Sequence, residues 1–344
     1  MTTTYGTKRR LTAGFNSGLF FFGACLLTGT AHASLALTPA GSTAGFALSL
    51  FATTNPTAGP TDTGPLGVAV TGNGKVIVNT FSLACILSGV TSCRFIFPDV
   101  DGQTTSSAIS FTPSNSLISG YATTGGLAYG GENGKFVQFN NDGTVNHILT
   151  GVTVAPLAGM ATNPVNGHLI ANTASGIIDI DALANGGAGS FRSVSNFGGD
   201  GIAVSSDGST AYTGSLAVNL ATGAFTVFTP NIPGADGIGV IHSTNSLNGK
   251  IVVNANTGIV WLVDPVTGAQ TKIASGGTRG DYASADPTNG SIFLDFSRDV
   301  WRLSCGPDCS IGSVAPVPNP AAAWLFGSAL TMFGWVRCKG GAAV

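Results

Sequence analysis

Charge is what this chain has least of: Asp, Glu, Lys and Arg make up 9% of its 344 residues, against roughly 25% in an ordinary soluble protein. Glutamate occurs once, at Glu132, and lysine and arginine together number 14. Strong helix formers are therefore scarce, which argues against a helical fold. The 50 glycines favour strands joined by tight turns, because glycine adopts the positive φ angles that turns need. Hydrophobic residues, at 43%, suffice for a core and argue against disorder.

Basic residues are especially few in the middle of the chain. Five of the 14 lie in the terminal segments, at Lys8, Arg9, Arg10, Arg337 and Lys339. All 16 acidic residues lie between Asp62 and Asp308. The region between the two ends therefore holds 9 basic and 16 acidic residues, a net charge of −7. Such a region lacks the basic footprint of a nucleic-acid-binding protein, and we exclude that class.

Familiar catalytic patterns are missing as well. The chain has no Gly-x-Ser-x-Gly nucleophile elbow and no phosphate-binding loop. His147, His168 and His242 stand far apart, unlike a paired ligand set, and we interpret them as strand or turn residues. The sequence Asp99-Val100-Asp101-Gly102 resembles a fragment of a calcium loop but lacks the distal Glu. We therefore name no catalytic residue.

Residues 1–33 contain the three parts of a secretory signal peptide. Basic residues 8–10 precede a short apolar run, residues 19–27, and Ala31-His32-Ala33 forms a small-x-small cleavage signal. We expect signal peptidase to cleave before Ser34. The alternative for this segment is a buried core helix.

The C-terminal end predicts a membrane anchor. Residues 311–320 form a Pro-rich linker, and the 16 residues 321–336 are uncharged and mostly apolar. As a helix they would extend roughly 24 Å, slightly short of a bilayer, which snorkelling by Arg337 and Lys339 could offset. Basic residues after a span hold that end in the cytoplasm, so the tail 337–344 is expected inside and the bulk of the chain outside.

A sorting motif precedes this predicted span: Val317, Pro318, Asn319 and Pro320, followed by Ala-Ala-Ala-Trp-Leu-Phe. With the apolar helix and the basic end, it resembles the PEP-CTERM sorting signal, and most closely its Val-Pro-x-Pro-Ala-Ala-x-Trp-Leu-Phe variant. The resemblance implies recognition and cleavage by a membrane exosortase, in a bacterium that makes exopolysaccharide. Asn319 replaces the usual Glu, which leaves the position of cleavage open. An unprocessed anchor is the alternative.

Cysteine placement fits export. Cys25 would leave with the signal peptide, and four cysteines remain in the exported region: Cys85, Cys93, Cys305 and Cys309. Each pair is close in sequence, so an oxidising compartment favours two local disulfides. A metal site for the four thiols is the rival interpretation, although no histidine lies near any of them in sequence.

Repeats predict an all-β fold for residues 34–310. Similar units, each an apolar strand, a Gly-containing turn and a second strand, open near Gly67, Gly159, Gly201, Gly237 and Asp281, with a degenerate unit near residues 116–150. Units of about 40 residues with four short strands are typical of β-propeller blades. We count six blades and leave a seventh open, with a β-sandwich or β-solenoid as alternatives.

The last repeat unit has only three predicted strands before Cys305. The segment 45–52 alternates apolar and polar residues and has no unit of its own. If it supplied the outer strand of the last blade, the ring would close and one exposed strand edge would disappear.

The Asp-Gly-Ile-Ala-Val type of opening resembles NHL-type, gluconolactonase-like and quinoprotein-like six-bladed propellers. In such a propeller Asp200, Asp236 and Asp281 would lie at the channel mouth, where they could bind a cation such as Ca²⁺. The alternative is that each caps the amides of its own turn. A lactonase of this kind would also need a Glu ligand, and Glu132 lies in a segment that looks like a surface turn. We therefore expect no cofactor, with Ca²⁺ as the candidate if one binds.

These observations favour an exported, non-catalytic propeller with a binding or structural role, at the cell envelope or in an exopolysaccharide matrix. Its expected partners are signal peptidase and exosortase during processing, the membrane before processing, and exopolysaccharide afterwards. The second hypothesis is a hydrolase or lyase that acts on a small or saccharide substrate in the propeller channel.

The two ends predict how the mature protein is processed. If signal peptidase and an exosortase act on the chain, the mature protein begins at Ser34 and lacks the segment beyond Pro320. Mass spectrometry of the surface or secreted protein measures both ends. An intact C-terminal segment in cells that possess an exosortase would contradict the sorting prediction and leave the anchor prediction standing.

Overall fold

The computed structural model describes residues 34–312, except 82, 88, 115–119, 231 and 307. These residues belong to the compact unit Ala33–Val344, and the unit Met1–His32 contributes none of them. The predicted signal peptide 1–33, the motif 317–320, the span 321–336 and the tail 337–344 lie outside the described residues. No helix within the described ranges is long and apolar enough to cross a membrane.

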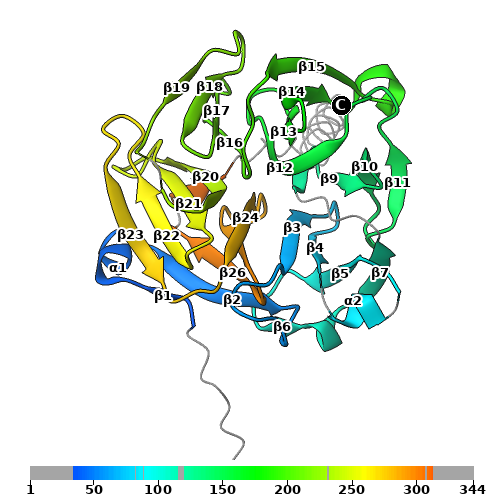
Figure 1. Ribbon diagram of the computed structural model, residues 1–344, viewed down its shortest axis with the longest axis horizontal. Helices are drawn as coiled ribbons and strands as arrows, with labels where there is room; N and C mark the ends of the chain where they lie inside the picture. The colour runs from blue at the N-terminus through cyan, green and yellow to red at the C-terminus, as the bar shows by residue number, and fades with distance from the viewer. Residues whose placement is uncertain are drawn as a thin grey trace, which may run out of the picture. The chain divides into compact units, whose positions relative to one another are not determined.

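Six antiparallel sheets follow one another along the chain and form a closed ring (Figure 1). In four of the sheets the strands pair in chain order, from an inner strand at the axis to an outer strand at the rim, and the other two sheets add strands from elsewhere in the chain. The inner strands contact each other in sequence, and the last returns to the first. The prediction of a six-bladed β-propeller is therefore confirmed, and the seventh blade and the alternative folds are not needed.

The first three blades occupy the N-terminal half of the ring. Blade 1 comprises β3 (Pro65–Val70), β4 (Lys75–Thr80), β5 (Ser92–Pro98) and β7 (Ser110–Ser114). Blade 2 comprises β8 (Ala122–Thr124), β9 (Leu127–Glu132), β10 (Lys135–Phe139) and β11 (Val145–Ile148). Blade 3 comprises β12 (Pro156–Thr162), β13 (Leu169–Thr173), β14 (Gly176–Asp181) and β15 (Ser190–Ser195).

Blade 4 is built from consecutive strands, whereas blades 5 and 6 also recruit strands from elsewhere in the chain. Blade 4 comprises β16 (Ala203–Val204), β17 (Thr210–Thr213), β18 (Leu216–Asn219) and β19 (Phe225–Val227). Blade 5 comprises β20 (Ala235–Ser243), β21 (Ile251–Ala255), β22 (Ile259–Val263) and β23 (Gln270–Ser275), with β1 (Ala36–Leu37) and β27 (Cys309–Ile311) at its two edges. Blade 6 comprises β24 (Gly280–Ala285), β25 (Ile292–Phe296), β26 (Asp299–Ser304), β2 (Ala47–Thr53) and β6 (Gln103–Thr104).

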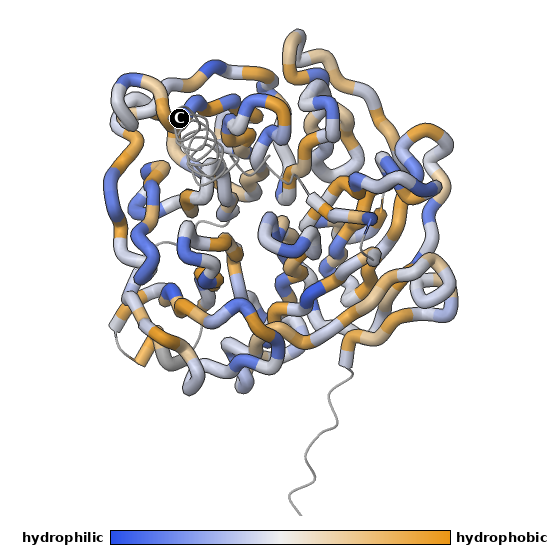
Figure 2. Tube along the Cα trace, turned by 180° about the vertical axis from the view of Figure 1, so that it is seen from behind, coloured by the Kyte–Doolittle hydropathy of each residue, from blue (hydrophilic) through white to orange (hydrophobic). Residues whose placement is uncertain are grey.

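The hydrophobic core is divided among the interfaces between blades. The second strands carry continuous apolar runs and are buried on both faces, as in β21, where all five residues are buried. Outer strands are more exposed, and all three residues of β19 face solvent. Figure 2 accordingly shows hydrophobic stretches distributed around the ring rather than gathered in one place. Short helices occupy connections: α1 (Pro39–Thr43), α2 (Leu83–Leu87), η1 (Thr105–Ser107) and η2 (Ala184–Gly187).

The ring is closed by a strand from the beginning of the described chain. The sequence placed the outer strand of the last blade at residues 45–52, and β2 pairs with β26 from Ala47 opposite Ser304 to Thr53 opposite Asp299. On its other edge β2 pairs with β6, which lies between two strands of blade 1 in the chain. In Figure 1 the blue β2 lies beside the orange β26. Strand β2 therefore completes blade 6 and also links it to blade 1.

Arg302 of β26 strengthens this closure. Its guanidinium lies 5.1 Å from the ring centre of Phe51 on β2 and 5.0 Å from that of Phe293 on β25. It also pairs with Asp99 and Asp101, in the loop that follows β5 of blade 1. The carboxylates of the segment 99–102, which resembles a fragment of a calcium loop, therefore pair with Arg302, and these ion pairs link blade 1 to blade 6.

Removal of β2 should break the ring. A variant lacking residues 34–54 exposes the backbone edge of β26, and an unpaired edge recruits other chains. We expect this variant to aggregate or to lose its cooperative thermal transition. A matched variant lacking only residues 34–45 loses β1 and α1 but keeps β2, and should remain monomeric. Size-exclusion chromatography and thermal melts compare the two, and equal behaviour of both variants would show that β2 is dispensable.

Candidate functional site

Glycines allow the inner strands to approach one another closely where they begin. A Cβ atom added to Gly120 would lie 2.7 Å from the backbone of Gly159, and one added to Gly201 would lie 2.1 Å from the carbonyl oxygen of Asp236. Carbon atoms normally stay 3.5–4.0 Å apart, so no larger residue fits. The backbones of successive blades therefore touch at this level, and the axis is narrow.

The propeller axis is filled at this end. Leu66 of blade 1, Ala158 of blade 3 and Tyr282 of blade 6 form one buried apolar cluster. Tyr282 directly follows Asp281, whereas glycine follows the equivalent aspartates of blades 4 and 5, at Gly201 and Gly237. Blade 6 therefore places a large ring where those two blades have no side chain. Apolar side chains from blades on different sides of the ring thus close the axis.

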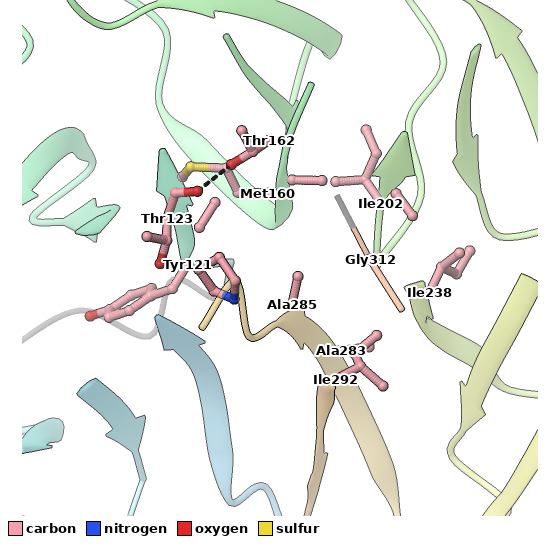
Figure 3. A pocket seen from close by; sticks show the side chains of 14 residues that line it. Tyr121, Thr123, Met160, Thr162, Ile202, Ile238, Ala283, Ala285, Ile292 and Gly312 are labelled. Atoms are coloured by element: carbon pink, nitrogen blue, oxygen red, sulfur yellow. Dashed lines mark hydrogen bonds between the residues drawn. The ribbon is translucent and has the colours of Figure 1, made fainter. Parts of the chain in front are cut away.

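The other end of the axis is also covered. Strand β27 pairs with the end of β20, and a Cβ atom on Gly312 would lie 2.5 Å from the Cβ atom of Ala285. The cavity between the two closures has a volume of about 20 Å³ and is lined by side chains such as Met160, Ile202 and Ile238 (Figure 3). That volume suits a single water molecule. This cavity is therefore too small for a saccharide substrate.

The three aspartates singled out from the sequence lie close enough to influence one another. Asp236 and Asp281 are buried, at 3% and 1% exposure, whereas Asp200 is exposed. Arg279 pairs with Asp281, with 2.6 Å between Nη2 and Oδ1. Burial, followed by the charges of Asp200 and Asp281, raises the pKa of Asp236 to about 8. Burial raises the pKa of Asp281 to about 6 against the opposing effect of Arg279.

A fourth carboxyl, Asp295 on β25, belongs to the same cluster. It is fully buried, and burial followed by the charges of Asp281 and Asp236 raises its pKa well above the ordinary value. No three His, Cys, Asp or Glu side chains in the described part of the chain are arranged to hold a metal ion. Burial thus favours the protonated forms of Asp236 and Asp295 in this cluster.

Asp295 holds a position that is asparagine in three other blades. Asn79, Asn172 and Asn254 occupy the same place near the end of the second strand of blades 1, 3 and 5. Asn172 donates to the carbonyl of Asp200, at 2.6 Å, and Asn254 donates to the carbonyl of Asp295, at 2.9 Å. Two of these amides therefore tie their blade to the next one. A protonated carboxyl resembles an amide in carrying both a donor and an acceptor, which fits the raised pKa of Asp295.

Glu132 corrects one interpretation drawn from the sequence. The turn that follows it at Asn133 and Gly134 exists, but the Glu132 side chain is buried, not part of a surface turn. It pairs with Arg94 of blade 1 and accepts a hydrogen bond from Ser114, at 2.7 Å. The chain's one glutamate thus joins blades 1 and 2, because an unpaired buried charge would be costly there.

The cysteine pairs are joined as two local disulfides, Cys85 with Cys93 and Cys305 with Cys309, so none of these four thiols is left for a metal site. Of the histidines, His147 lies with Nε2 3.0 Å from the carbonyl oxygen of Gly187. His242 is largely buried, and burial lowers its pKa. These two histidines thus have structural surroundings, as the sequence suggested.

A pocket of about 490 Å³ opens between blades 2 and 3. It is formed by residues 124–129 around the β8–β9 turn, residues 165–168 of the β12–β13 loop, and residues 181–183 after β14. These connections lie at the same end of the ring as β27, because they follow the ends of inner strands just as β27 covers the end of β20. The volume lies within the roughly 300–1,000 Å³ that small-molecule sites occupy.

His168 lies in the wall of this pocket and is held by a buried carboxylate. Its Nδ1 is 2.7 Å from Oδ1 of Asp179, whose side chain is only 6% exposed. The other oxygen of Asp179 accepts a hydrogen bond from Arg192, at 2.7 Å. On the pocket side, Nε2 of His168 lies 3.9 Å from Oδ2 of Asp181. Polar groups from one hairpin and its flanking turns thus converge on the pocket.

Sequence reasoning treated His168 as an isolated residue and missed this network. The signal was the alternation Ile-Asp-Ile-Asp in β14, which places Asp179 and Asp181 on one face. Strands β13 and β14 pair with Leu169 opposite Ile180, so His168 lies opposite Asp181 in the same hairpin. A strand register predicted for this hairpin from the sequence would therefore have placed His168, Asp179 and Asp181 close together.

Comparisons with known proteins add little about function. No protein-family model matches the chain, and no curated protein matches it. Among 1100 matching chains of solved structures is an auxiliary nutrient binding protein from Bacteroides thetaiotaomicron, which is 10% identical with a TM-score of 0.49. That alignment covers 75% of this chain and 76% of the other. The argument for function therefore rests on the geometry described above.

The buried carboxyls predict a pH dependence of stability. Because the pKa of Asp236 is about 8 in the folded state, against 3.8 ordinarily, the folded protein retains a proton that the unfolded chain releases. The contribution of Asp236 to stability should be fully present below about pH 4 and be lost as pH rises to about 8, by up to about 1.4 kcal/mol per pH unit for one proton. Asp281, with a pKa of about 6, adds to the fall between pH 4 and 6.

Urea denaturation at several pH values tests this dependence. In Asp236→Asn the titrating group is gone and the side chain keeps its size, so the slope between pH 6 and 8 should flatten. Asp308→Asn, at an exposed position, serves as the control and should keep the original slope. A steep loss of stability above pH 6 that persists in Asp236→Asn would assign the effect to another group.

Proposed function

We propose that this chain is an exported, surface-sorted propeller that binds a ligand outside the cell and has no catalytic role. The main support for this proposal is a difference in volume. The cavity on the propeller axis has about 20 Å³, whereas the pocket between blades 2 and 3 has about 490 Å³. Convergent polar groups in a preformed pocket are typical of binding sites. The proposed setting is the envelope or exopolysaccharide matrix of a biofilm-forming bacterium, which rests on the PEP-CTERM resemblance of the C-terminal segment.

The covalent structure supports residence outside the cytoplasm. Both cysteine pairs of the propeller form disulfides, and such bonds persist mainly in oxidising compartments. The low charge of the chain and its acidic middle region fit neither a nucleic-acid partner nor an anionic lipid surface for that region.

Hydrolysis or lyase chemistry in the channel has less support. The axial cavity holds no more than a water, and the buried aspartates beside it favour their protonated forms. His168, oriented by Asp179, has the arrangement of a general base. However, no hydroxyl or thiol of a described residue forms a hydrogen bond with it. The pocket therefore offers a place to bind a molecule, and its one threonine hydroxyl, that of Thr124, donates to the carbonyl of Gly167 rather than to His168.

Binding to the native matrix tests the proposal. The protein purified from the producing bacterium should co-sediment with the exopolysaccharide of that organism. It should release no new reducing ends or lactone hydrolysis products during prolonged incubation. A protein that stays in the supernatant would contradict the binding role, and turnover of matrix fragments would favour the hydrolase.

A further inference from the structure

Two residues in the wall of the blade 2–3 pocket, His168 and Asp181, carry hydrogen-bond acceptors. An ionised carboxylate accepts only, so the short contact between His168 and Asp179 requires the proton of the neutral ring to lie on Nδ1. Nε2 then carries a lone pair toward the pocket. Asp181 uses Oδ1 to accept the amides of Leu183 and Ala184, both at 3.1 Å, and its Oδ2 is left for the pocket. Two acceptors 3.9 Å apart thus face the same space.

The position of these acceptors is fixed by the surrounding structure. Asp179 is held by Arg192, and Arg192 in turn donates to the carbonyl of Leu220 in blade 4, at 2.9 Å. The backbone amide of His168 donates to Oδ1 of Asn166, at 3.0 Å. Asp179 therefore orients the imidazole and Asn166 fixes its backbone before any ligand arrives, which reduces the entropy lost on binding.

Apolar side chains lie beside these acceptors in the pocket wall. Val165 and Leu183 line the pocket and are 63% and 69% exposed, and Leu127 lines it as well. Aliphatic side chains next to fixed acceptors suit a molecule with C–H faces and O–H edges. The NH₂ group of Asn166, whose Oδ1 is already used, adds one donor at the rim.

We infer that this pocket binds a neutral, hydroxyl-rich ligand, a saccharide unit, whose O–H groups donate to His168 Nε2 and Asp181 Oδ2. The inference rests on the proposed binding function and names its site and ligand class. Asp181 carries a negative charge. Among the described residues, the one group paired with it is His168, which is a cation when it is protonated. An acidic saccharide would therefore be repelled, whereas a neutral one satisfies both acceptors.

Titration of the purified full-length protein, kept in a zwitterionic detergent free of sugar, tests this inference. The probes are trisaccharides of one size: neutral maltotriose, cellotriose and mannotriose, and acidic trigalacturonate. We expect at least one neutral trisaccharide to bind at least tenfold more tightly than trigalacturonate. Failure of all three neutral sugars, or preference for the acidic one, would overturn the assignment of ligand class.

Four variants locate the site. His168→Phe keeps a ring but removes the acceptor, and should weaken neutral-sugar binding at least tenfold. His168→Gln can place an amide oxygen near the Nε2 position and should recover part of that loss. Asp181→Asn keeps a cap for the Leu183 and Ala184 amides but removes the charge, and should narrow the discrimination against trigalacturonate. The control, His147→Phe on β11, does not line the pocket and should bind within twofold of the parent.

Thermal melts show whether each variant is folded, and only folded variants are compared. If His168→Phe and Asp181→Asn bind neutral trisaccharides as the parent does, the pocket is not the site. Co-sedimentation with the native matrix would then still report separately on the proposed function. A loss of binding in His168→Phe that His168→Gln does not relieve at all would assign His168 a packing role and remove the acceptor from the inference.

Discussion

The close approach of the inner strands at the axis constrains most of this structure. Gly120, Gly159 and Gly201 bring the backbones of blades 2, 3, 4 and 5 against one another, at distances that a Cβ atom would forbid. The second strands are drawn inward with them, so their last polar side chains are buried. In blade 6 that side chain is Asp295, and its burial near Asp236 and Asp281 perturbs the whole carboxyl cluster. A tight axis therefore accounts both for the raised pKa values and for the position of the larger pocket, which lies toward the rim.

Two ion pairs of the described residues lie at junctions between blades. Arg94 and Glu132 join blades 1 and 2, and Arg302 and Asp99 join blades 6 and 1. Buried ion pairs add little net stability but are costly to break, so they penalise wrong pairings more than they strengthen the right one. In a fold of six similar sheets, such pairs help to distinguish one blade junction from another.

The propeller fold was predictable because it depends on periodicity. Strand alternation, glycine turns and the 40-residue repeat are local features, and the structure confirms the six blades that they predicted. Cysteine spacing likewise predicted the two disulfides, because each joins residues that are close in the chain. The predicted aspartates do lie near one another, but in a buried group whose geometry is not that of a metal site.

What the sequence did not reveal depends on contacts between repeats. Glu132 looked like a turn residue because Arg94, its partner, lies in a different blade. Asp295 drew no attention because its burial results from the packing of strands on three sides. The pocket was missed because no single segment forms it, although the His168–Asp181 part follows from one hairpin register. The sequence shows which polar and charged residues could form a site, but only the three-dimensional arrangement shows which of them already pair with other residues of the protein.

The ring is sealed by strands from both ends of the described chain, and this has a consequence for how the protein is made. Strand β2 finds its partner β26 only after nearly the whole propeller has been synthesised, and β27 covers the axis later still. Contacts between residues so distant in sequence form slowly, because a long loop must close first. A chain threaded through a secretion channel from its N-terminus would therefore carry β2 unpaired until translocation is almost complete. Secretory chaperones that shield strand edges would have their longest engagement with this segment.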